Sequence, residues 1–396
     1  MRLIFINHVH PETPHVSATR MREFARACAA AGHQVVLLTE TLPGKASTLP
    51  PAALPAAFDR HDWRMPFPLA CAPVPDRLVV RLREGKIAAP IRKPLIAATY
   101  LARAGMFTDW RDGSRPYWAA LASAFRPDTI WATFGNTDAW VIAQGIARLS
   151  GSRWVMDLKD PWSVFIPALL RKILASRFTD FAGATALSYQ HAKDTERWFG
   201  CRPTVIYSGI ENVFLRAPAP VPLQDPRQIL VVGGLYADNH LAALVDGIAR
   251  WATGGEIVAY AGNERVRFLA AARKLADRVR LETPGYLDLG GLRAVAADSA
   301  ALLYVRHPRA LYQHKLIELL ALERPVLSLP GESAEAHAIA DKLGARLISC
   351  TDAAALAVGL TEATATGLTF IDRRRLAGYT WTAQAARLLS VLENSA

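Results

Sequence analysis

The sequence is poor in cysteine and contains no long apolar run. Its four cysteines, Cys28, Cys71, Cys201 and Cys350, are far apart and form no CxxC pair or Cys/His cluster, which argues against a disulfide framework or a zinc site. We expect reduced, mostly buried thiols. Arg, Lys or Pro interrupts every long apolar segment, so no segment should span a bilayer. The short run at the N-terminus, MRLIFINHVH, lacks the features of a signal sequence and is interpreted as a strand, which favours a cytoplasmic protein.

Acidic residues are also few relative to basic ones. The chain has 46 Lys and Arg against 35 Asp and Glu, a formal net charge of +11. This excess suits phosphate-bearing ligands or an anionic membrane surface better than a cationic partner.

Several familiar motifs are missing. Gly233-Gly234 does not complete a GxGxxG fingerprint, and no Walker loop, HExxH or GxSxG is present. Tryptophans and tyrosines are scattered, which argues against a nucleic-acid groove. No acidic pair with the DxD spacing of a metal site appears in a plausible strand-end loop, so we expect neither a bound metal nor a cofactor.

What is present is a regular alternation of strand-like and helical patterns, which predicts parallel sheets. We expect an α/β fold with two Rossmann-like, doubly wound domains whose ligands bind between them at the strands' C-terminal ends. The boundaries predicted are 1–210 for an N-terminal Rossmann-like domain, 211–228 for a linker with four prolines, 229–380 for a C-terminal Rossmann-like domain, and 381–396 for a C-terminal helix that packs back on the first domain. The strands expected are Leu3–Ile6, Gln34–Thr39, Thr129–Thr133, Trp154–Leu158, Gly183–Ser188, Thr204–Ser208, Ile229–Val232, Ile257–Tyr260, Val279–Leu281, Ala301–Val305 and Val326–Leu329, with helices at Thr19–Ala31, Leu241–Trp251 and Thr382–Leu392.

Residues 76–107 form a basic segment in which Arg and Lys alternate with apolar residues. Such a stretch can lie in an anionic headgroup region, with apolar side chains inserted and cations near lipid phosphates. The alternative is an ordinary solvated basic face.

The stretch YQHKLIELLALERPVLSLP, residues 312–330, carries the clearest chemical signal. Lys315 and Glu318 are three apart on a predicted helix that ends at Arg324-Pro325, so both face the same way. A cation in the first turn suits a diphosphate, and a carboxylate one turn later can accept hydrogen bonds from ribose hydroxyls. An ordinary surface ion pair is the alternative.

This stretch resembles the donor segment of retaining GT-B glycosyltransferases of the large bacterial sucrose-synthase-like family. The resemblance extends to SATRMREFARACAAAGHQVVLLT near the N-terminus, to DLKDPW (157–162), to YSGIE (207–211) and to PGESAEAHAIADKLGARLIS. It implies that Glu318 holds the donor ribose and that the donor is a nucleoside diphosphate sugar, used as a co-substrate.

The chain also departs from that family's pattern. Ala310 stands where the first glutamate of the E-x7-E motif is expected, and the usual Arg and Lys ligands near Gly233-Gly234 are absent. Lys315, Arg306, His307 and the backbone amides of Gly233 and Gly234 remain as candidates for phosphate binding. Lys315 is also a catalytic candidate, because the charge on the diphosphate grows as the glycosidic bond breaks.

Candidate acceptor residues lie in the first half. Asp157 and Asp160 follow a buried strand, where a carboxylate can deprotonate an acceptor hydroxyl, although Asp-Pro-Trp can equally start a helix. His8 and His15, on the loop after the first strand, are candidates for acceptor binding, and solvated loop histidines are the alternative.

The sequence therefore predicts a metal-independent, hexosyltransferase-like glycosyltransferase that acts on a glycan or lipid-linked acceptor in bacterial surface polysaccharide synthesis. It would be cytoplasmic, and peripheral on the inner membrane if residues 76–107 bind lipid. Two alternatives remain: a GT-B sugar-nucleotide epimerase, and a non-catalytic sugar-nucleotide-binding GT-B protein.

Overall fold

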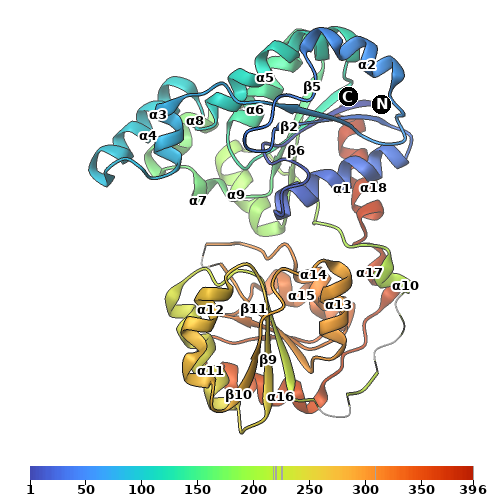
Figure 1. The fold of residues 1–396 in the computed structure, drawn as a ribbon. Coiled ribbons are helices and arrows are strands. Elements are labelled where there is room, and N and C mark those ends of the chain that lie inside the picture. The colour runs from blue at the N-terminus through green and yellow to red at the C-terminus, as the bar shows by residue number, and fades with distance from the viewer. Residues whose placement is uncertain (217, 219–220, 224–225, 308, 396) are drawn as a thin grey trace. The chain divides into compact units, whose positions relative to one another are not determined.

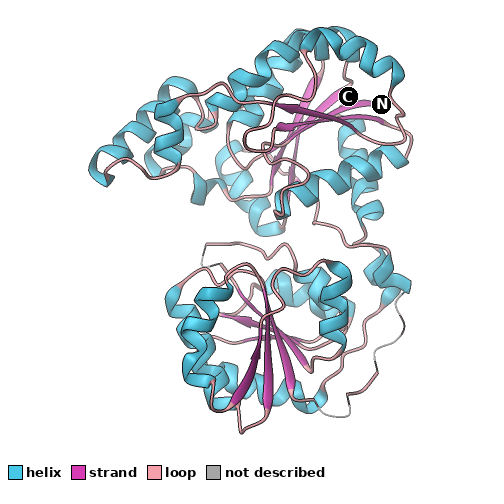
Figure 2. Ribbon diagram, viewed as in Figure 1, coloured by secondary structure: helices cyan, strands magenta, loops and turns pink. Residues whose placement is uncertain are grey.

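The computed structural model describes residues 1–396 except 217, 219–220, 224–225, 308 and 396. The chain forms two compact units, of which the first comprises residues 1–209 and 381–396 and the second residues 210–380. Each unit contains one parallel sheet with helices packed around it (Figures 1 and 2). The predicted fold class, two Rossmann-like domains, is confirmed.

The first unit has a sheet of seven strands in the order β3-β2-β1-β4-β5-β6-β7 among the described residues. Neighbouring strands are parallel throughout, and both faces are covered. Ile4 and Ile6 belong to one apolar cluster while Leu3 and Phe5 belong to another, because alternate residues of a strand point to opposite faces. The strands are β1 (Arg2–Ile6), β2 (Gln34–Glu40), β3 (Phe67–Cys71), β4 (Thr129–Thr133), β5 (Arg153–Leu158), β6 (Gly183–Ala186) and β7 (Thr204–Val205).

Helices α1 (Val16–Ala30) and α18 (Trp381–Asn394) cover one face of this sheet. The rings of Phe24 and Trp381 meet edge to face at 5.4 Å, and the side-chain oxygen of Gln384 accepts a hydrogen bond from the backbone N–H of Tyr207 at 2.9 Å. The C-terminal helix therefore belongs to the first unit. The other helical elements of this unit are η1 (Pro51–Ala53), α2 (Leu54–Arg60), α3 (Arg77–Arg83), α4 (Ala89–Arg103), α5 (Thr108–Ala120), η2 (Leu121–Phe125), α6 (Asp138–Ser150), α7 (Trp162–Phe165), η3 (Ala168–Leu170), α8 (Arg171–Ala175) and α9 (Tyr189–Phe199).

The second unit has a parallel sheet of six strands, in the order β10-β9-β8-β11-β12-β13 over the residues described. β8 and β11 lie at its centre. Its strands are β8 (Gln228–Val232), β9 (Glu256–Ala261), β10 (Val279–Glu282), β11 (Ala301–Val305), β12 (Val326–Leu329) and β13 (Leu347–Ser349). Its helical elements are α10 (Val213–Arg216), α11 (Asp238–Trp251), α12 (Arg265–Ala271), η4 (Ala272–Leu275), α13 (Leu289–Ala297), α14 (Leu316–Leu320), α15 (Ala334–Leu343), α16 (Ala353–Thr366) and α17 (Arg373–Ala377).

Some expected boundaries shift for local reasons. Helix α1 begins at Val16 rather than Thr19, because the imidazole of His15 accepts a hydrogen bond from the backbone N–H of Ser17 and so caps the helix. Helix α14 ends at Leu320, before the predicted stop at Arg324-Pro325. Of the predicted linker, residues 213–216 form α10 in the second unit, and residues 217, 219–220 and 224–225 lie outside the described residues.

The four cysteines are free, and Cys28, Cys71 and Cys350 are buried, as predicted. Burial raises the pKa of the Cys28 and Cys71 thiols to about 12, which keeps both neutral. Among the described residues no helix has the length and apolar character needed to cross a membrane.

Candidate functional site

The loop after β8 presents bare backbone at the carboxyl edge of the second sheet. Gly233 has a φ of +93°, and a Cβ placed there would meet no atom within 4 Å, so one side of the loop is open. The other side is fixed. The hydroxyl of Tyr260 donates to the carbonyl oxygen of Gly233 at 2.9 Å, and the N–H of Leu235 donates to the carboxylate of Glu264 at 2.6 Å. This arrangement lets a ligand approach the backbone closely.

Arg306 and His307 directly follow the neighbouring strand β11, and His307 contacts Tyr236 just after the glycine loop. The ring of His307 packs edge to face on Tyr236 with centroids 4.9 Å apart. Burial, together with nearby Arg309, lowers the pKa of His307, so this imidazole is neutral at pH 7. The buried Nε of Arg306 has no hydrogen-bond partner among the residues described, while one terminal nitrogen reaches the carbonyl of Ala310 at 3.4 Å. Arg306 therefore retains donors for an anion.

Lys315 and Glu318 lie at the start of α14. Glu318 is half-buried in the helix, and Lys315 immediately precedes the helix rather than standing inside it. Burial raises the pKa of the Glu318 carboxyl, the charge of Lys315 opposes that rise, and Glu211 adds to it. The ammonium of Lys315 stands 5.7 Å from the ring centroid of Tyr286. The cation and carboxylate paired in the sequence prediction are thus close in space.

Two further residues beside this pair were not anticipated. Glu211, the first residue of the predicted linker, lies in the second unit and acts electrostatically on Glu318. Tyr286 lies between β10 and α13 with 57% of its side chain exposed. A single tyrosine in a loop belongs to no helical or strand pattern in the sequence. Its position near Lys315 is therefore seen only in the folded structure.

Asp157, predicted as a catalytic base, is enclosed in the first unit. Its carboxylate has no exposed surface and faces Arg20, also fully buried, at 3.2 Å. The hydroxyls of Thr133 and Thr185 donate to its oxygens at 2.7 and 2.8 Å. These contacts give Asp157 a structural role. Its role as a catalytic base stays a prediction, and its complete burial does not favour that role.

Asp160, His15 and His8 gather at the carboxyl edge of the first sheet together with Lys159, which sequence reasoning did not include. Lys159 is only 4% exposed and forms an ion pair with Asp160. Burial is the main reason that the pKa of His15 is lowered, and the charges of Lys159 and His8 lower it further. The carboxylate of Asp160 acts in the opposite direction. The neutral ring of His15 caps α1.

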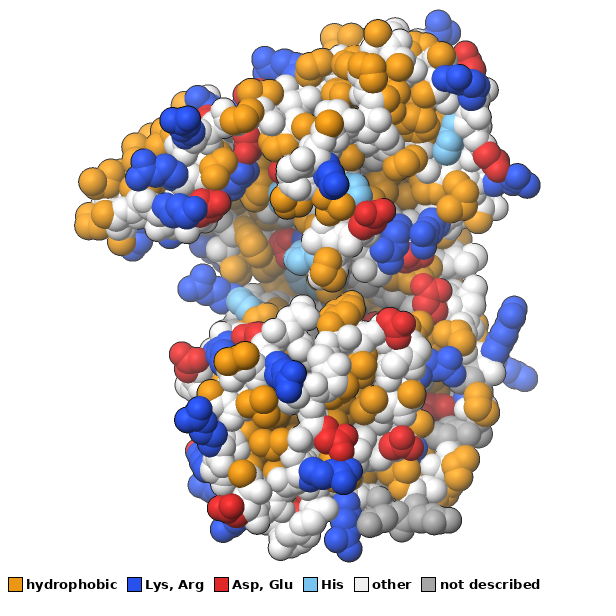
Figure 3. Space-filling model, viewed as in Figure 1, with side chains coloured by type: hydrophobic (Ala, Val, Ile, Leu, Met, Phe, Trp, Pro, Cys, Tyr) orange, Lys and Arg blue, Asp and Glu red, His pale blue; other side chains and the backbone are white. Residues whose placement is uncertain are grey.

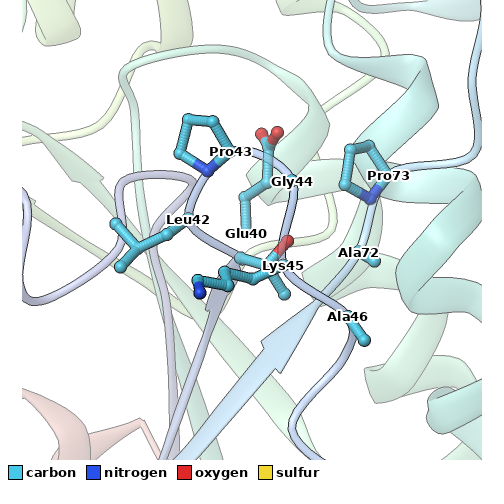
Figure 4. A pocket seen from close by; sticks show the side chains of 9 residues that line it. Glu40, Leu42, Pro43, Gly44, Lys45, Ala46, Ala72 and Pro73 are labelled. Carbon is cyan, nitrogen blue, oxygen red and sulfur yellow. The ribbon is translucent and has the colours of Figure 1, made fainter.

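His8 also pairs with Glu40, a residue absent from the sequence prediction. Its Nε2 lies 3.3 Å from the Glu40 carboxylate, and its ring packs edge to face on Phe107 at 4.1 Å. Glu40 lines a cavity of about 330 Å³. The cavity is formed by the loops after β2 and β3, and Lys45 shares its lining (Figure 4). A carboxylate that orients an imidazole beside a cavity is an arrangement suited to proton transfer.

Within the described part of the chain, no group of three or more His, Cys, Asp or Glu side chains is arranged to hold a metal ion.

Solved structures of similar fold extend over almost the whole chain. HepE of Anabaena, solved with UDP-glucose, is 15% identical, with 98% of this chain and 99% of that one covered at a TM-score of 0.61. The lipopolysaccharide outer core galactosyltransferase WaaB is 12% identical over 100% of both chains, at a TM-score of 0.62. A Listeria monocytogenes protein described as a putative UDP-N-acetylglucosamine 2-epimerase is 11% identical, with 99% of this chain and 95% of that one covered at a TM-score of 0.53. These likenesses establish the GT-B fold. No protein-family model and no curated protein sequence matches the chain.

Proposed function

We propose that this GT-B chain transfers a sugar from a nucleoside diphosphate sugar to a glycan or lipid-linked acceptor. The observation that supports this most is the position of Lys315 and Glu318 within one turn at the start of α14, in the unit whose glycine loop is open to a ligand. Surface polysaccharide synthesis at the cytoplasmic side of the inner membrane is the setting we propose, because the basic, apolar segment 76–107 suits a lipid-linked acceptor.

In this proposal the second unit holds the donor. Glu318 accepts hydrogen bonds from the ribose hydroxyls, and the exposed ring of Tyr286 offers a surface on which a base can stack. The backbone of Gly233 and Gly234 approaches the diphosphate, with neutral His307 beside it. Arg306 and Lys315 supply the positive charge that stabilises the leaving diphosphate as the glycosidic bond breaks.

The first unit would hold the acceptor near His8, His15, Lys159 and Asp160. An inverting reaction needs a base for the acceptor hydroxyl, and the imidazole of His8, oriented by Glu40, suits that task better than the enclosed Asp157. A retaining reaction, which the sequence resemblance implies, needs no such base. The anomeric configuration of the product, read by NMR, distinguishes the two.

The donor proposal predicts a selective thermal shift. Among UDP-, GDP- and ADP-sugars, at least one should raise the melting temperature, since a ligand at a hundred times its Kd stabilises the native state by about 2.7 kcal/mol. Nucleoside diphosphate should then be released only when an acceptor is added. Turnover of the donor without a second sugar would support the epimerase alternative, and binding without any release under a full acceptor panel would support the non-catalytic one.

We also propose that the reaction is metal-independent, because cationic side chains and neutral donors surround the proposed diphosphate position. EDTA should therefore leave the rate of nucleoside diphosphate release unchanged. A rate that falls with EDTA and recovers with magnesium or manganese would contradict this.

A further inference from the structure

The first unit carries a surface formed by α3, α4, the last residue of α7, η3 and α8, which we call the hairpin face. Helices α3 and α4 pack on each other, and α4 packs on η3. The side chain of Arg177, just after α8, donates a hydrogen bond to the carbonyl of Leu101 in α4 at 2.6 Å. This bond links the α8 segment to α4. The sequence interpretation had included only residues 76–107, so residues 165–177 extend this surface.

Apolar side chains are unusually exposed across the hairpin face. Leu169 in η3 is 91% exposed, and Ile91 in α4 is 59% exposed. Of the fifteen residues of α4 only Tyr100 is buried, although the helix is amphipathic. Figure 3 shows hydrophobic and basic side chains intermingled over the α3–α4 projection. Further exposed apolar residues on this face are Leu78, Leu101, Phe165 and Ile173.

Two groups of basic residues on the face differ in their partners. Arg83 pairs with Asp109, Arg103 pairs with Asp76, and Arg92 donates to the carbonyl of Leu82 at 2.9 Å, so these three hold the hairpin together. The second group is exposed, and no carboxylate pairs with its members within the described ranges: Arg77, Arg81, Lys93 and Lys172. This second group is free to meet phosphates.

We propose that the hairpin face binds the surface of an anionic lipid bilayer. Single exposed apolar residues among unpaired cations suit insertion at the headgroup level, where the apolar side chains leave water and the cations meet lipid phosphates. The positive charge selects an anionic bilayer over a neutral one. This proposal concerns a different surface from the donor site and does not depend on the proposed activity.

The test is sedimentation of the full chain with phosphatidylglycerol-containing vesicles and with pure phosphatidylcholine vesicles. The wild type should sediment with the former, weakly with the latter, and less as salt is added. Replacing Arg77, Arg81, Lys93 and Lys172 with Gln should weaken binding more than a hundredfold, roughly fivefold for each cation. The matched control replaces four exposed arginines elsewhere on the same unit with Gln, namely Arg26, Arg60, Arg115 and Arg202, and should bind nearly as wild type.

A second variant tests insertion independently of charge. Leu169→Ser changes a side chain that is 91% exposed, so its melting temperature should match the wild type while its vesicle affinity falls severalfold. The proposal would be overturned if the wild-type protein did not sediment with anionic vesicles. It would also be overturned if the hairpin-face charge variant bound these vesicles as well as the matched control. Failure of the donor experiments would leave these vesicle results unaffected.

Discussion

Replacing Glu318 with alanine should weaken binding of the nucleotide sugar roughly 10- to 150-fold, because it removes charge-assisted hydrogen bonds to ribose that contribute about 1.5–3 kcal/mol. The measurement is the Kd of the sugar nucleotide identified by thermal shift.

Lys315→Ala should instead lower kcat more than it raises Kd, because Lys315 acts on charge that grows in the transition state.

The stability of the ligand-free protein provides the control. Burial raises the pKa of Glu318, so its ionised form is disfavoured in the folded state. The stability associated with this carboxyl is greatest at low pH, where the group is protonated in both states, and declines as pH rises from its unfolded pKa through its raised folded pKa. Glu318→Gln removes this cost at neutral pH and should leave the ligand-free protein at least as stable as wild type while weakening donor binding. If Glu318→Gln and Glu318→Ala both bound the sugar nucleotide with wild-type affinity, the Glu318 carboxylate would not be part of the donor site.

Replacing Asp157 with alanine should lower the free energy of unfolding by about 3–5 kcal/mol, because the buried guanidinium of Arg20 loses its charged partner. Two hydroxyls, those of Thr133 and Thr185, lose their acceptor at the same time. The loss is measured by urea denaturation of the ligand-free protein. Asp157→Asn keeps the shape and should still be strongly destabilised, because the charge is gone.

A double variant separates this structural role from catalysis. Arg20→Met combined with Asp157→Leu should recover much of the lost stability, since no uncompensated charge remains buried. An Asp157→Asn protein with wild-type stability and no transferase activity would instead restore Asp157 as the base.

The fold was predictable because its central strands are continuous apolar runs. Thr129–Thr133, Ala301–Val305 and Val326–Leu329 match the expected bounds, and each is buried along its length. The edge strands β3 and β13 were not predicted. β3 contains Pro68, which weakens a strand pattern, and β13 has three residues that are incompletely buried.

The site was predictable only where its residues are close in sequence. Lys315 and Glu318 are three residues apart, so local structure alone brings them together. Arg20 and Asp157 are separated by 137 residues, and Glu40 ends β2 whereas His8 follows β1. Each of these pairs forms because β1 lies between β2 and β4, with β5 beyond β4, an order that the strand patterns do not specify.

The packing of α18 on the first unit has a consequence for synthesis on the ribosome. Leu388 and Leu392 complete the apolar cluster that also contains Phe24 and Trp131, yet the ribosome makes them after the whole of the second unit. During translation the second unit can close its core while one face of the first sheet still lacks its last helix. The first unit is therefore begun first and completed last, and we expect apolar side chains on that face to stay uncovered until residues 381–396 are made.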